Sequence, residues 1–144
     1  MRIFVAGATG VIGVRLMPLL VGQGHTVAGL TRSTQKRRML EDLGAEAIVC
    51  DVYDASALRT AAVAFRPDAM VNELTDLPDR VEDLAHFAAR NDRMRREGTR
   101  NFLDAARAAS VIRQLTLARR SPVAVRALGS ELPPARRVRR ATPA

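Results

Sequence analysis

Gly7-Ala8-Thr9-Gly10-Val11-Ile12-Gly13 is the stretch that decides the fold of this sequence. The apolar run Arg2 to Ala6 precedes it, and Val11 to Val21 follows with apolar residues at helical spacing. In a turn between strand and helix, the first glycine allows a tight bend, the second lets the backbone approach a pyrophosphate, and the third lets the helix lie close to the strand. We therefore predict a phosphate-binding turn whose residues are Gly7, Thr9, Gly10, Val11, Ile12 and Gly13. The alternative is a glycine-rich turn that binds nothing.

The sequence up to residue 118 alternates between strand and helix patterns. Strands are predicted near residues 2–6, 26–30, 46–50, 69–74 and 112–117, and helices near 11–21, 35–43, 55–65, 79–90 and 92–109. Gly44 is expected to end one helix, Asp54 to cap the next, and Pro18 to disturb the first. Strict alternation with short connections predicts an α/β fold, a Rossmann-type doubly wound parallel sheet of about five strands in the order 3-2-1-4-5.

The basic charge of the chain is concentrated at its end. Of the net charge of +8, +7 comes from residues 111–144 and +1 from residues 1–110. Residues 119–144 also hold four prolines and few large apolar side chains, so we expect a folded domain over 1–118 and a disordered basic tail over 119–144. Nucleic acid is not an expected partner, because the folded part is nearly neutral and arginine replaces lysine throughout the chain except at Lys36.

Thr31-Arg32-Ser33 follows the second predicted strand, where dinucleotide-binding domains choose between two cofactors. An acidic residue at this position would bind the adenosine ribose and favour NAD, but this position of the sequence has no acidic residue. Arg32 could instead hold a 2′-phosphate through paired hydrogen bonds, with Ser33 adding a hydroxyl and Lys36 adding positive charge. We predict that NADP(H) is favoured over NAD(H), with Thr31, Arg32 and Ser33 in the site. A solvated basic loop is the alternative.

Polar residues also follow the third and fourth predicted strands. Asp51 could accept a hydrogen bond from the adenine amino group while Val52 packs on the ring, or Asp51 could only cap local N–H groups. Asn72 and Glu73 lie at the sheet edge where ligands bind in open α/β folds. We include both in the predicted cofactor site, although a solvent-facing strand end is the expected surrounding of Glu73.

Several other classes of protein are disfavoured by composition. Cys50 is the single cysteine and is expected to be a buried packing residue, so no internal disulfide can form. His25 and His86 are isolated, and no metal site is predicted. The sequence has no apolar stretch of the ~18 residues that a membrane span needs and no signal-peptide pattern, so we expect a cytoplasmic protein with no membrane partner.

The glycine turn, the Leu30-Thr31-Arg32 ending, Asp51 and the stretch from Glu97-Gly98-Thr99 to Ala106 together resemble a known family. The sequence is similar to the extended or atypical short-chain dehydrogenase/reductases, in particular the NAD-dependent epimerase/dehydratase group, over about residues 1–117. The resemblance implies a bound nicotinamide cofactor and hydride chemistry on a carbonyl or alcohol substrate. Gly98 would let its helix lie close to the sheet.

The departures from that family concern its catalytic residues. The family pattern has asparagine where this sequence has Arg95, and its catalytic serine aligns poorly with Ser121. Its Tyr-x-x-x-Lys pair is absent, because Tyr53 is the only tyrosine and Lys36 the only lysine. No catalytic residue is therefore predicted, and whether the chain is an enzyme stays open. The abrupt change near residues 112–118 suggests the hypothesis of a frameshift or truncated reading frame, which resequencing would test.

Two functions follow from this sequence. The first is the NAD(P)-binding part of an epimerase/dehydratase-like oxidoreductase, without catalysis on its own. The second is a non-catalytic module that senses NADP(H) or binds another protein. An unpaired sheet edge beyond the fifth strand would favour a second copy or a partner chain.

Overall fold

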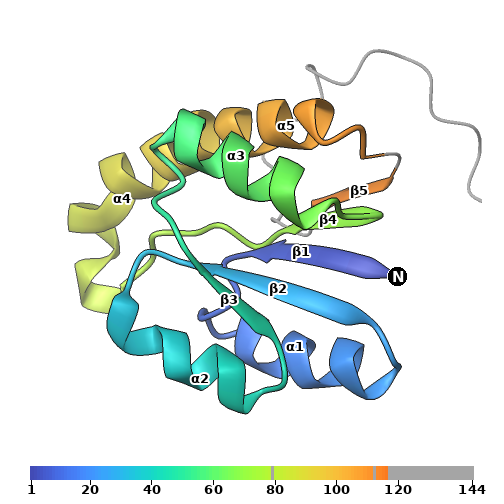
Figure 1. The fold of residues 1–144 in the computed structure, drawn as a ribbon. Coiled ribbons are helices and arrows are strands. Elements are labelled where there is room, and N and C mark those ends of the chain that lie inside the picture. Colours follow the sequence, from blue (N-terminus) through green and yellow to red (C-terminus); the bar gives the residue numbers. More distant parts are fainter. Residues whose placement is uncertain (79, 112, 117–144) are drawn as a thin grey trace, which may run out of the picture.

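The computed structural model describes residues 1–78, 80–111 and 113–116. Within them the chain forms one five-stranded sheet in the order β3-β2-β1-β4-β5, and all four strand pairs are parallel (Figure 1). The strands are β1 (Arg2–Ala6), β2 (Thr26–Thr31), β3 (Glu46–Val49), β4 (Ala69–Asn72) and β5 (Arg113–Thr116). The predicted α/β class, strand number and strand order are confirmed.

Helices cover both faces of the sheet. The α-helices are α1 (Gly13–Gly22), α2 (Arg37–Asp42), α3 (Ala55–Phe65), α4 (Leu84–Arg93) and α5 (Thr99–Ala108). Helices α1 and α2 lie on one face, α3 and α5 lie on the other, and α4 extends past the carboxyl end of the strands (Figure 1). Three short segments complete the described elements: the 3-10 turns Thr34–Lys36 and Val81–Asp83, and the π-helical turn Met94–Gly98.

The central strand β1 separates two apolar layers. Phe4 packs on the α3/α5 side, with its ring 6.0 Å from the Phe65 ring and 6.4 Å from the Phe102 ring. Val5 faces the other layer with Met17 and Leu40 from α1 and α2. Apolar layers cover both faces of β1, which explains why Ile3, Phe4, Val5 and Ala6 form a continuous buried apolar run rather than an alternating one.

Local signals predicted several helix ends correctly. The Asp54 carboxylate accepts a hydrogen bond from the Ala57 N–H at 2.9 Å and caps α3, and Gly44 follows α2 with φ +80°. Pro18 lies inside α1. Cys50 is buried, as expected.

Several boundaries differ from prediction: the strand predicted over 69–74 ends at Asn72, and the helix predicted from residue 79 begins at Leu84. Helix α1 begins at Gly13 rather than at Val11, because the backbone of Val11 and Ile12 still belongs to the turn. The two helices predicted on either side of Asn91 are one continuous helical run, in which α4 and α5 are joined by the π-helical turn. Asn91 does not interrupt the run, because its side-chain oxygen accepts a hydrogen bond from the Asp76 N–H outside the helix, at 3.1 Å.

Two further expectations concern the limits of the domain. The predicted tail, residues 119–144, lies outside the described residues. Among the helices that are described, none is long and apolar enough to cross a membrane.

Candidate functional site

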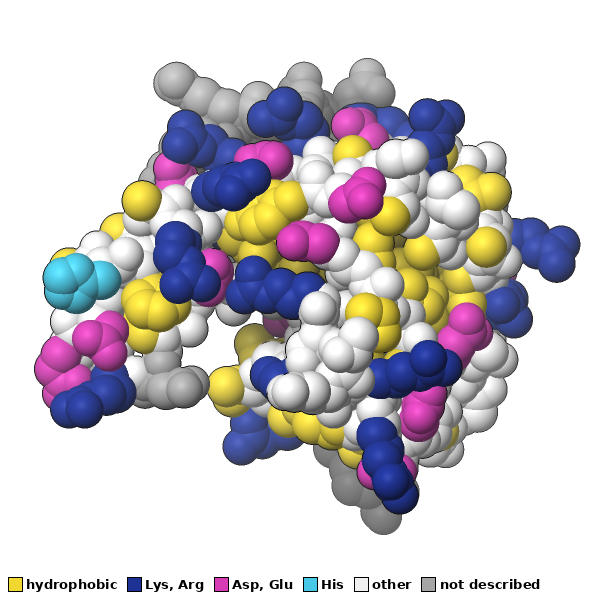
Figure 2. Space-filling model, turned by 60° about the vertical axis from the view of Figure 1, so that its left-hand side comes forward, with side chains coloured by type: hydrophobic (Ala, Val, Ile, Leu, Met, Phe, Trp, Pro, Cys, Tyr) yellow, Lys and Arg dark blue, Asp and Glu magenta, His cyan; other side chains and the backbone are white. Residues whose placement is uncertain are grey.

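A cavity of about 680 Å³ lies at the carboxyl end of the sheet. Every residue predicted for the cofactor site lines it except Asn72. Further lining residues are Leu30, Lys36, Cys50, Leu74, Thr75, Asp76, Leu77, Pro78 and Met94. Figure 2 shows the molecule hollowed between the segment that carries α4 and the body of the domain, with Lys and Arg side chains along the rim. The sequence therefore identified residues that are brought together in space.

The glycine turn forms one wall of this cavity, and two of its glycines have no room for a side chain. Gly7 has φ +80°, and a Cβ atom there would lie 2.4 Å from the Glu73 carbonyl oxygen. A Cβ atom on Gly13 would lie 2.4 Å from the Gly7 carbonyl oxygen. At Gly10 the nearest atom would be that same oxygen, at 3.2 Å, with no other described atom within 4 Å. The turn is thus packed from behind and open beside Gly10, which suits the approach of a phosphate.

Helix α1 directs its amino end into the cavity. The first turn of α1 contains no acidic side chain, and its N-cap residue, Ile12, makes no side-chain capping hydrogen bond. The Gly10 N–H donates to the Gly7 carbonyl at 3.0 Å, which closes the turn before the helix. The positive end of the helix dipole is therefore not neutralised by the helix itself, and an anion at this place would be stabilised.

The end of β2 brings a guanidinium to the cavity. Arg32 lines it with a side chain that is 55% exposed, and one Nη atom lies 3.9 Å from a carboxylate oxygen of Asp76. The Ser33 N–H donates to the Thr31 hydroxyl at 3.2 Å, so Thr31 shapes the turn that presents Arg32. Lys36 also lines the cavity and adds positive charge on the same side.

Asp76 is a site residue that sequence reasoning missed. It lies in the loop after β4, is buried, and lines the cavity. Its two carboxylate oxygens accept hydrogen bonds from Arg90 at 3.1 and 3.2 Å. The one signal in the sequence was an acidic residue shortly after a predicted strand. The arginine that pairs with it is fourteen residues away, at a distance that matches neither helical nor strand spacing, so the pair could not be recognised.

The end of β3 contributes Asp51 and Val52. The Asp51 carboxylate accepts a hydrogen bond from the Tyr53 N–H at 3.0 Å, which is the local capping contact weighed above. Asp51 remains exposed and lines the cavity, so the same side chain can also face a ligand. Val52 is buried, and its carbonyl accepts a hydrogen bond from the Asn101 side chain at 3.0 Å.

The two residues at the end of β4 have different surroundings. Asn72 does not line the cavity: its side-chain oxygen accepts from the Leu74 N–H at 3.0 Å and its amide donates to the Thr99 hydroxyl at 3.3 Å. It therefore joins β4 to α5. Glu73 lines the cavity but is 92% buried, so the expected solvent-facing strand end is wrong. The backbone of Glu73 lies close to Gly7, where a Cβ atom on Gly7 would meet the Glu73 carbonyl.

The Glu73 carboxyl is poorly compensated. Its Oε1 atom is buried and has no hydrogen-bond partner among the described residues. Burial raises the pKa of this carboxyl above its ordinary value of 4.5. A buried polar atom without a partner is costly, and such atoms in a cavity are typical of places where a ligand completes the hydrogen bonding.

Tyr53 and Cys50 lie near the cavity and have unreactive surroundings. Burial raises the pKa of Tyr53, and Arg93, whose guanidinium is 4.1 Å from the ring centre, opposes that shift. Burial is the largest cause of the raised pKa, and the carboxylates of Asp76 and Glu97 act in the same direction. Burial also raises the pKa of the Cys50 thiol. Neither group is primed to lose a proton.

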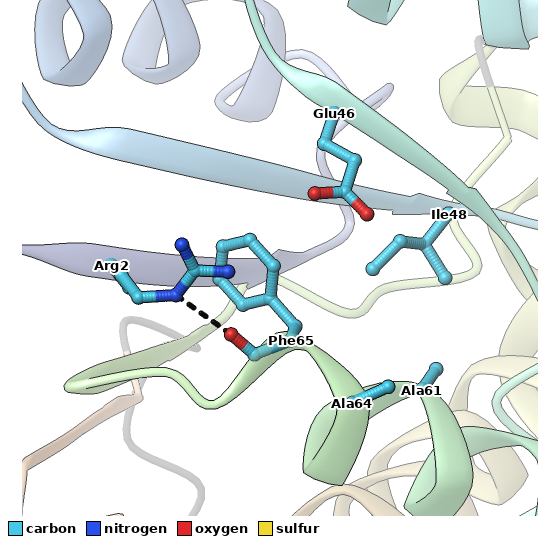
Figure 3. A pocket seen from close by; sticks show the side chains of 6 residues that line it. All are labelled: Arg2, Glu46, Ile48, Ala61, Ala64 and Phe65. Atoms are coloured by element: carbon cyan, nitrogen blue, oxygen red, sulfur yellow. Dashed lines mark hydrogen bonds between the residues drawn. The ribbon is translucent and has the colours of Figure 1, made fainter.

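A second, smaller hollow of about 220 Å³ lies near the start of β1, between β3 and α3. Figure 3 shows Arg2 and Glu46 among the side chains around it, with Arg2 Nε donating a hydrogen bond to the Phe65 carbonyl. None of the predicted site residues lines this hollow. In the described part of the chain, no group of three or more His, Cys, Asp or Glu residues could hold a metal ion.

Comparison with known proteins gives consistent matches over the same part of the chain. A family model described as the NAD dependent epimerase/dehydratase family matches residues 3–119. A 3-diazoavenalumate denitrifying reductase from a Streptomyces species is 38% identical over 113 residues, which are 78% of this chain and 36% of that protein. An uncharacterized protein of Mycobacterium tuberculosis is 34% identical over 105 residues, which are 73% of this chain and 10% of that protein. The chain therefore spans about a third or less of the length of these relatives.

Solved structures give the same result for the fold. The Bordetella bronchiseptica enzyme WbmG, solved in complex with NAD, superposes with a TM-score of 0.66 at 26% identity, over 81% of this chain and 36% of that one. The UDP-glucose 4-epimerase of Thermus thermophilus, also solved with NAD, has a TM-score of 0.68 at 24% identity, over 79% and 36% of the two chains, and this likeness shows the fold alone. The family model, the sheet order and the glycine turn agree, and the chain belongs to the NAD dependent epimerase/dehydratase family.

Proposed function

We propose that residues 1–118 are the cofactor-binding part of an epimerase/dehydratase-type oxidoreductase, and that the large cavity binds NADP(H) in preference to NAD(H). The observation that carries the proposal is the single cavity in which the glycine turn, the amino end of α1 and the Arg32 guanidinium meet. Relatives give support, because WbmG was solved with NAD and the Streptomyces relative is described as a reductase. A nicotinamide dinucleotide would supply hydride exchange there.

The residues of the cavity fit the parts of a dinucleotide. Gly10 and the start of α1 suit the pyrophosphate, because they combine an open backbone with a positive helix end. Val52 and Asp51, at the end of β3, suit an adenine ring through packing and an accepted hydrogen bond. Glu73 has an unpaired oxygen that a hydroxyl or amide of the ligand could satisfy.

The preference for the phosphorylated cofactor is a separate proposal, since the structural relatives reported above were solved with NAD. It is supported by Arg32 at the end of β2, by Lys36 on the same side of the cavity, and by the lack of an acid within residues 30–33. A guanidinium matches the geometry of a phosphate, whereas a ribose 2′-hydroxyl would gain little from it.

Calorimetric titration of the purified chain with NADPH and with NADH tests this proposal. NADPH should bind more tightly, and Arg32→Asp should reverse the preference. Loss of an arginine–phosphate contact should weaken NADPH binding by roughly ten- to a hundredfold, equivalent to about 1.5–3 kcal/mol. Arg37→Gln is the matched control, because Arg37 is an exposed neighbour that pairs with Glu41 and does not line the cavity. Equal affinities for the two cofactors in the unmodified chain would contradict the proposal.

We further propose that this chain by itself binds the cofactor without turning over a substrate. Its only tyrosine, Tyr53, has a raised pKa and does not line the cavity, and its only lysine, Lys36, lies beside Arg32. A positioned general acid or base typically contributes ~10²–10⁴ in rate, and the Tyr-x-x-x-Lys pair that would supply it in the family is absent from this sequence.

Absorbance of the nicotinamide ring measures this expectation. Purified chain with NADPH and a panel of sugar nucleotides, aldehydes and ketones should show no change above a protein-free control. Turnover would contradict the expectation, and the Tyr53→Phe variant would then distinguish two cases. Turnover that persists in this variant would reveal another catalytic group, whereas turnover that is lost would identify Tyr53 as the catalytic acid or base.

The sheet edge suggests a partner. Strand β5 is the last strand on its side of the described sheet, and an unpaired edge readily accepts another strand. We propose that a second copy or another chain pairs there, and sedimentation of the purified chain would show the oligomeric state.

A further inference from the structure

We propose that Asp76 is a specificity-determining residue of the cavity, which sets the balance between NADP(H) and NAD(H) binding by acting on Arg32. Arg90 is the positioning residue that holds Asp76. This inference rests on the proposed function of the cavity. It concerns a cluster of three charged side chains at the rim, contributed by the end of β2, the loop after β4 and helix α4.

The Asp76 carboxylate is held in place from two sides. Arg90 donates one hydrogen bond to each of its oxygens, at 3.1 and 3.2 Å, in a paired arrangement. The backbone N–H of Asp76 donates to the Asn91 side chain at 3.1 Å, one residue further along the same helix. With its side chain only 9% exposed, Asp76 keeps its position relative to the cavity.

Arg32 is the outer and looser member of the cluster. Its Nη atom lies 3.9 Å from Asp76, which is too long for a hydrogen bond but close enough for electrostatic attraction. Its side chain is 55% exposed, whereas that of Asp76 is nearly covered. The Arg32 guanidinium can therefore turn its N–H groups toward an anion in the cavity without leaving a buried carboxylate unpaired.

Asp76 weakens the attraction that Arg32 exerts on such an anion. A carboxylate at this distance cancels part of the positive potential of the guanidinium and also repels a phosphate directly. A 2′-phosphate carries the charge that senses this potential, whereas the 2′-hydroxyl of NADH carries none. Asp76 should thus lower the affinity for NADPH and leave that for NADH almost unchanged.

Arg90 limits that effect by occupying both oxygens of Asp76. Its guanidinium also stacks on the Phe87 ring, 4.6 Å from the ring centre, which fixes its direction. Without Arg90, the buried carboxylate would need another cation, and Arg32 is the nearest described one. Arg32 would then close on Asp76 and turn away from the cavity. Arg90 thus keeps Arg32 available.

The test is calorimetric titration of the full chain with NADPH and NADH for Asp76→Asn, Arg90→Gln and the double variant. Asp76→Asn should bind NADPH roughly tenfold more tightly, and Arg90→Gln roughly tenfold more weakly. NADH affinity should stay within about twofold in both, which also shows that the variants are folded. In the double variant, the loss caused by Arg90→Gln should largely disappear, because Arg90 acts through Asp76.

Two further variants keep the outcome decisive. Arg90→Lys retains the positive charge but not the paired contact, so it should weaken NADPH binding less than Arg90→Gln does, and the two Arg90 variants carry the test if Asp76→Asn does not fold. Arg93→Gln, on the same helix but paired with Glu97, is the matched control and should change nothing.

Failure of this inference and failure of the proposed function give different results. An unchanged NADPH-to-NADH ratio in Asp76→Asn, or parental affinity for NADPH in Arg90→Gln, would overturn the role of the cluster while cofactor binding stood. A chain that binds neither cofactor would overturn both proposals. If the ratio of NADPH to NADH affinity changed in Asp76→Asn but not in Arg32→Gln, the proposed action of Asp76 through Arg32 would be wrong. Direct repulsion of the phosphate by the Asp76 carboxylate would then explain the change.

Discussion

The two ends of the sheet are built from the same strands but differ in how their polar groups are satisfied. At the amino end, Arg2 donates from its backbone to Asp68 at 2.7 Å and from its side chain to the Phe65 carbonyl at 2.8 Å, and it stacks on the Phe65 ring at 4.4 Å. At the carboxyl end, Glu73 has a buried oxygen with no described partner, and Arg32 lies 3.9 Å from its nearest carboxylate. The polar groups of Arg2 at the amino end are therefore paired within the fold, whereas Glu73 Oε1 at the carboxyl end has no hydrogen-bond partner among the described residues.

The connections at the two ends explain this difference. Helix-to-strand connections, at the amino end, are short, and each contains a residue with positive φ: Gly24, Gly44, Arg66 and Ser110. Such tight turns satisfy their own backbone groups. Strand-to-helix connections, at the carboxyl end, are mostly longer and include residues 7–12, 50–54 and 73–80. These longer connections carry most of the residues that line the large cavity, as expected for open α/β sheets.

The largest expected effect of a single substitution is at Gly13, in the carboxyl-end turn. Gly13→Ala would place a Cβ atom 2.4 Å from the Gly7 carbonyl oxygen, so the turn must shift. We expect the free energy of unfolding to fall by about 1–3 kcal/mol, and dinucleotide binding to weaken by at least about tenfold. Chemical denaturation and calorimetric titration measure the two effects.

Gly22→Ala is the matched control at the other end of the same helix. A Cβ atom there would have no described atom within 4 Å. We expect a small gain in stability, about 0.5–1 kcal/mol, and unchanged binding. If Gly13→Ala behaved like Gly22→Ala, the close packing of the turn would have no part in the site.

The sequence predicted best what depends on neighbouring residues. The glycine turn, the Asp54 cap and the stop at Gly44 are each encoded within a few positions, and the strand order follows from the alternation of elements. The surroundings of Glu73 were not predictable in this way, since they include the backbone of Gly7, which is sixty-six residues earlier. The Asp76–Arg90 pair likewise joins a loop to a helix by tertiary packing.

The continuous helical run over α4 and α5 is a second example. Asn91 looks like a helix breaker in sequence, because its side chain commonly competes for local backbone groups. In the folded chain it bonds to Asp76 instead, and the run continues through the π-helical turn. That turn places Gly98 close to Val52, in keeping with the expected close approach of this helix to the sheet, and it places Met94 in the cavity wall, which no local pattern predicts.

A smaller effect is expected from Glu73→Gln, which removes the unpaired carboxylate at the carboxyl end. Burial raises the pKa of Glu73, so the folded chain holds this proton more tightly than the unfolded chain does. The stability that the group contributes is therefore present below about pH 4.5 and is lost as the pH rises through the folded-state pKa. Glu73→Gln should match the parent at the acidic end and exceed it in stability at neutral pH.

Unfolding midpoints measured across this pH range compare the two proteins. Glu82→Gln is a suitable control, because Glu82 is exposed and pairs with an exposed arginine. If the unfolding midpoints of the parent and Glu73→Gln depended on pH in the same way, the buried Glu73 carboxyl would already be compensated. The unpaired Glu73 oxygen would then no longer distinguish the carboxyl end of the sheet from the amino end.

The smallest expected effect lies at the amino end, where Arg66 ends α3 with φ +51°. A left-handed backbone costs a residue with a Cβ atom about 1–2 kcal/mol, whereas glycine adopts it without strain but loses more entropy on folding. Arg66 is exposed, and its recorded contact is the backbone hydrogen bond to Ala62, which glycine would keep. Arg66→Gly should therefore stabilise the chain by up to about 1 kcal/mol.

The reverse change at an equivalent turn supplies the comparison for Arg66→Gly. Gly44→Ala should destabilise the chain by about 1 kcal/mol, because φ is +80° there and the new Cβ atom would lie 3.0 Å from Val21. Neither substitution should alter dinucleotide affinity, since both turns lie at the end of the sheet away from the cavity. Thermal unfolding with and without NADPH separates the effect on stability from the effect on dinucleotide affinity. If a substitution changed the increase in Tm that NADPH causes, and not only Tm itself, the amino-end turns would influence the cavity through the strands.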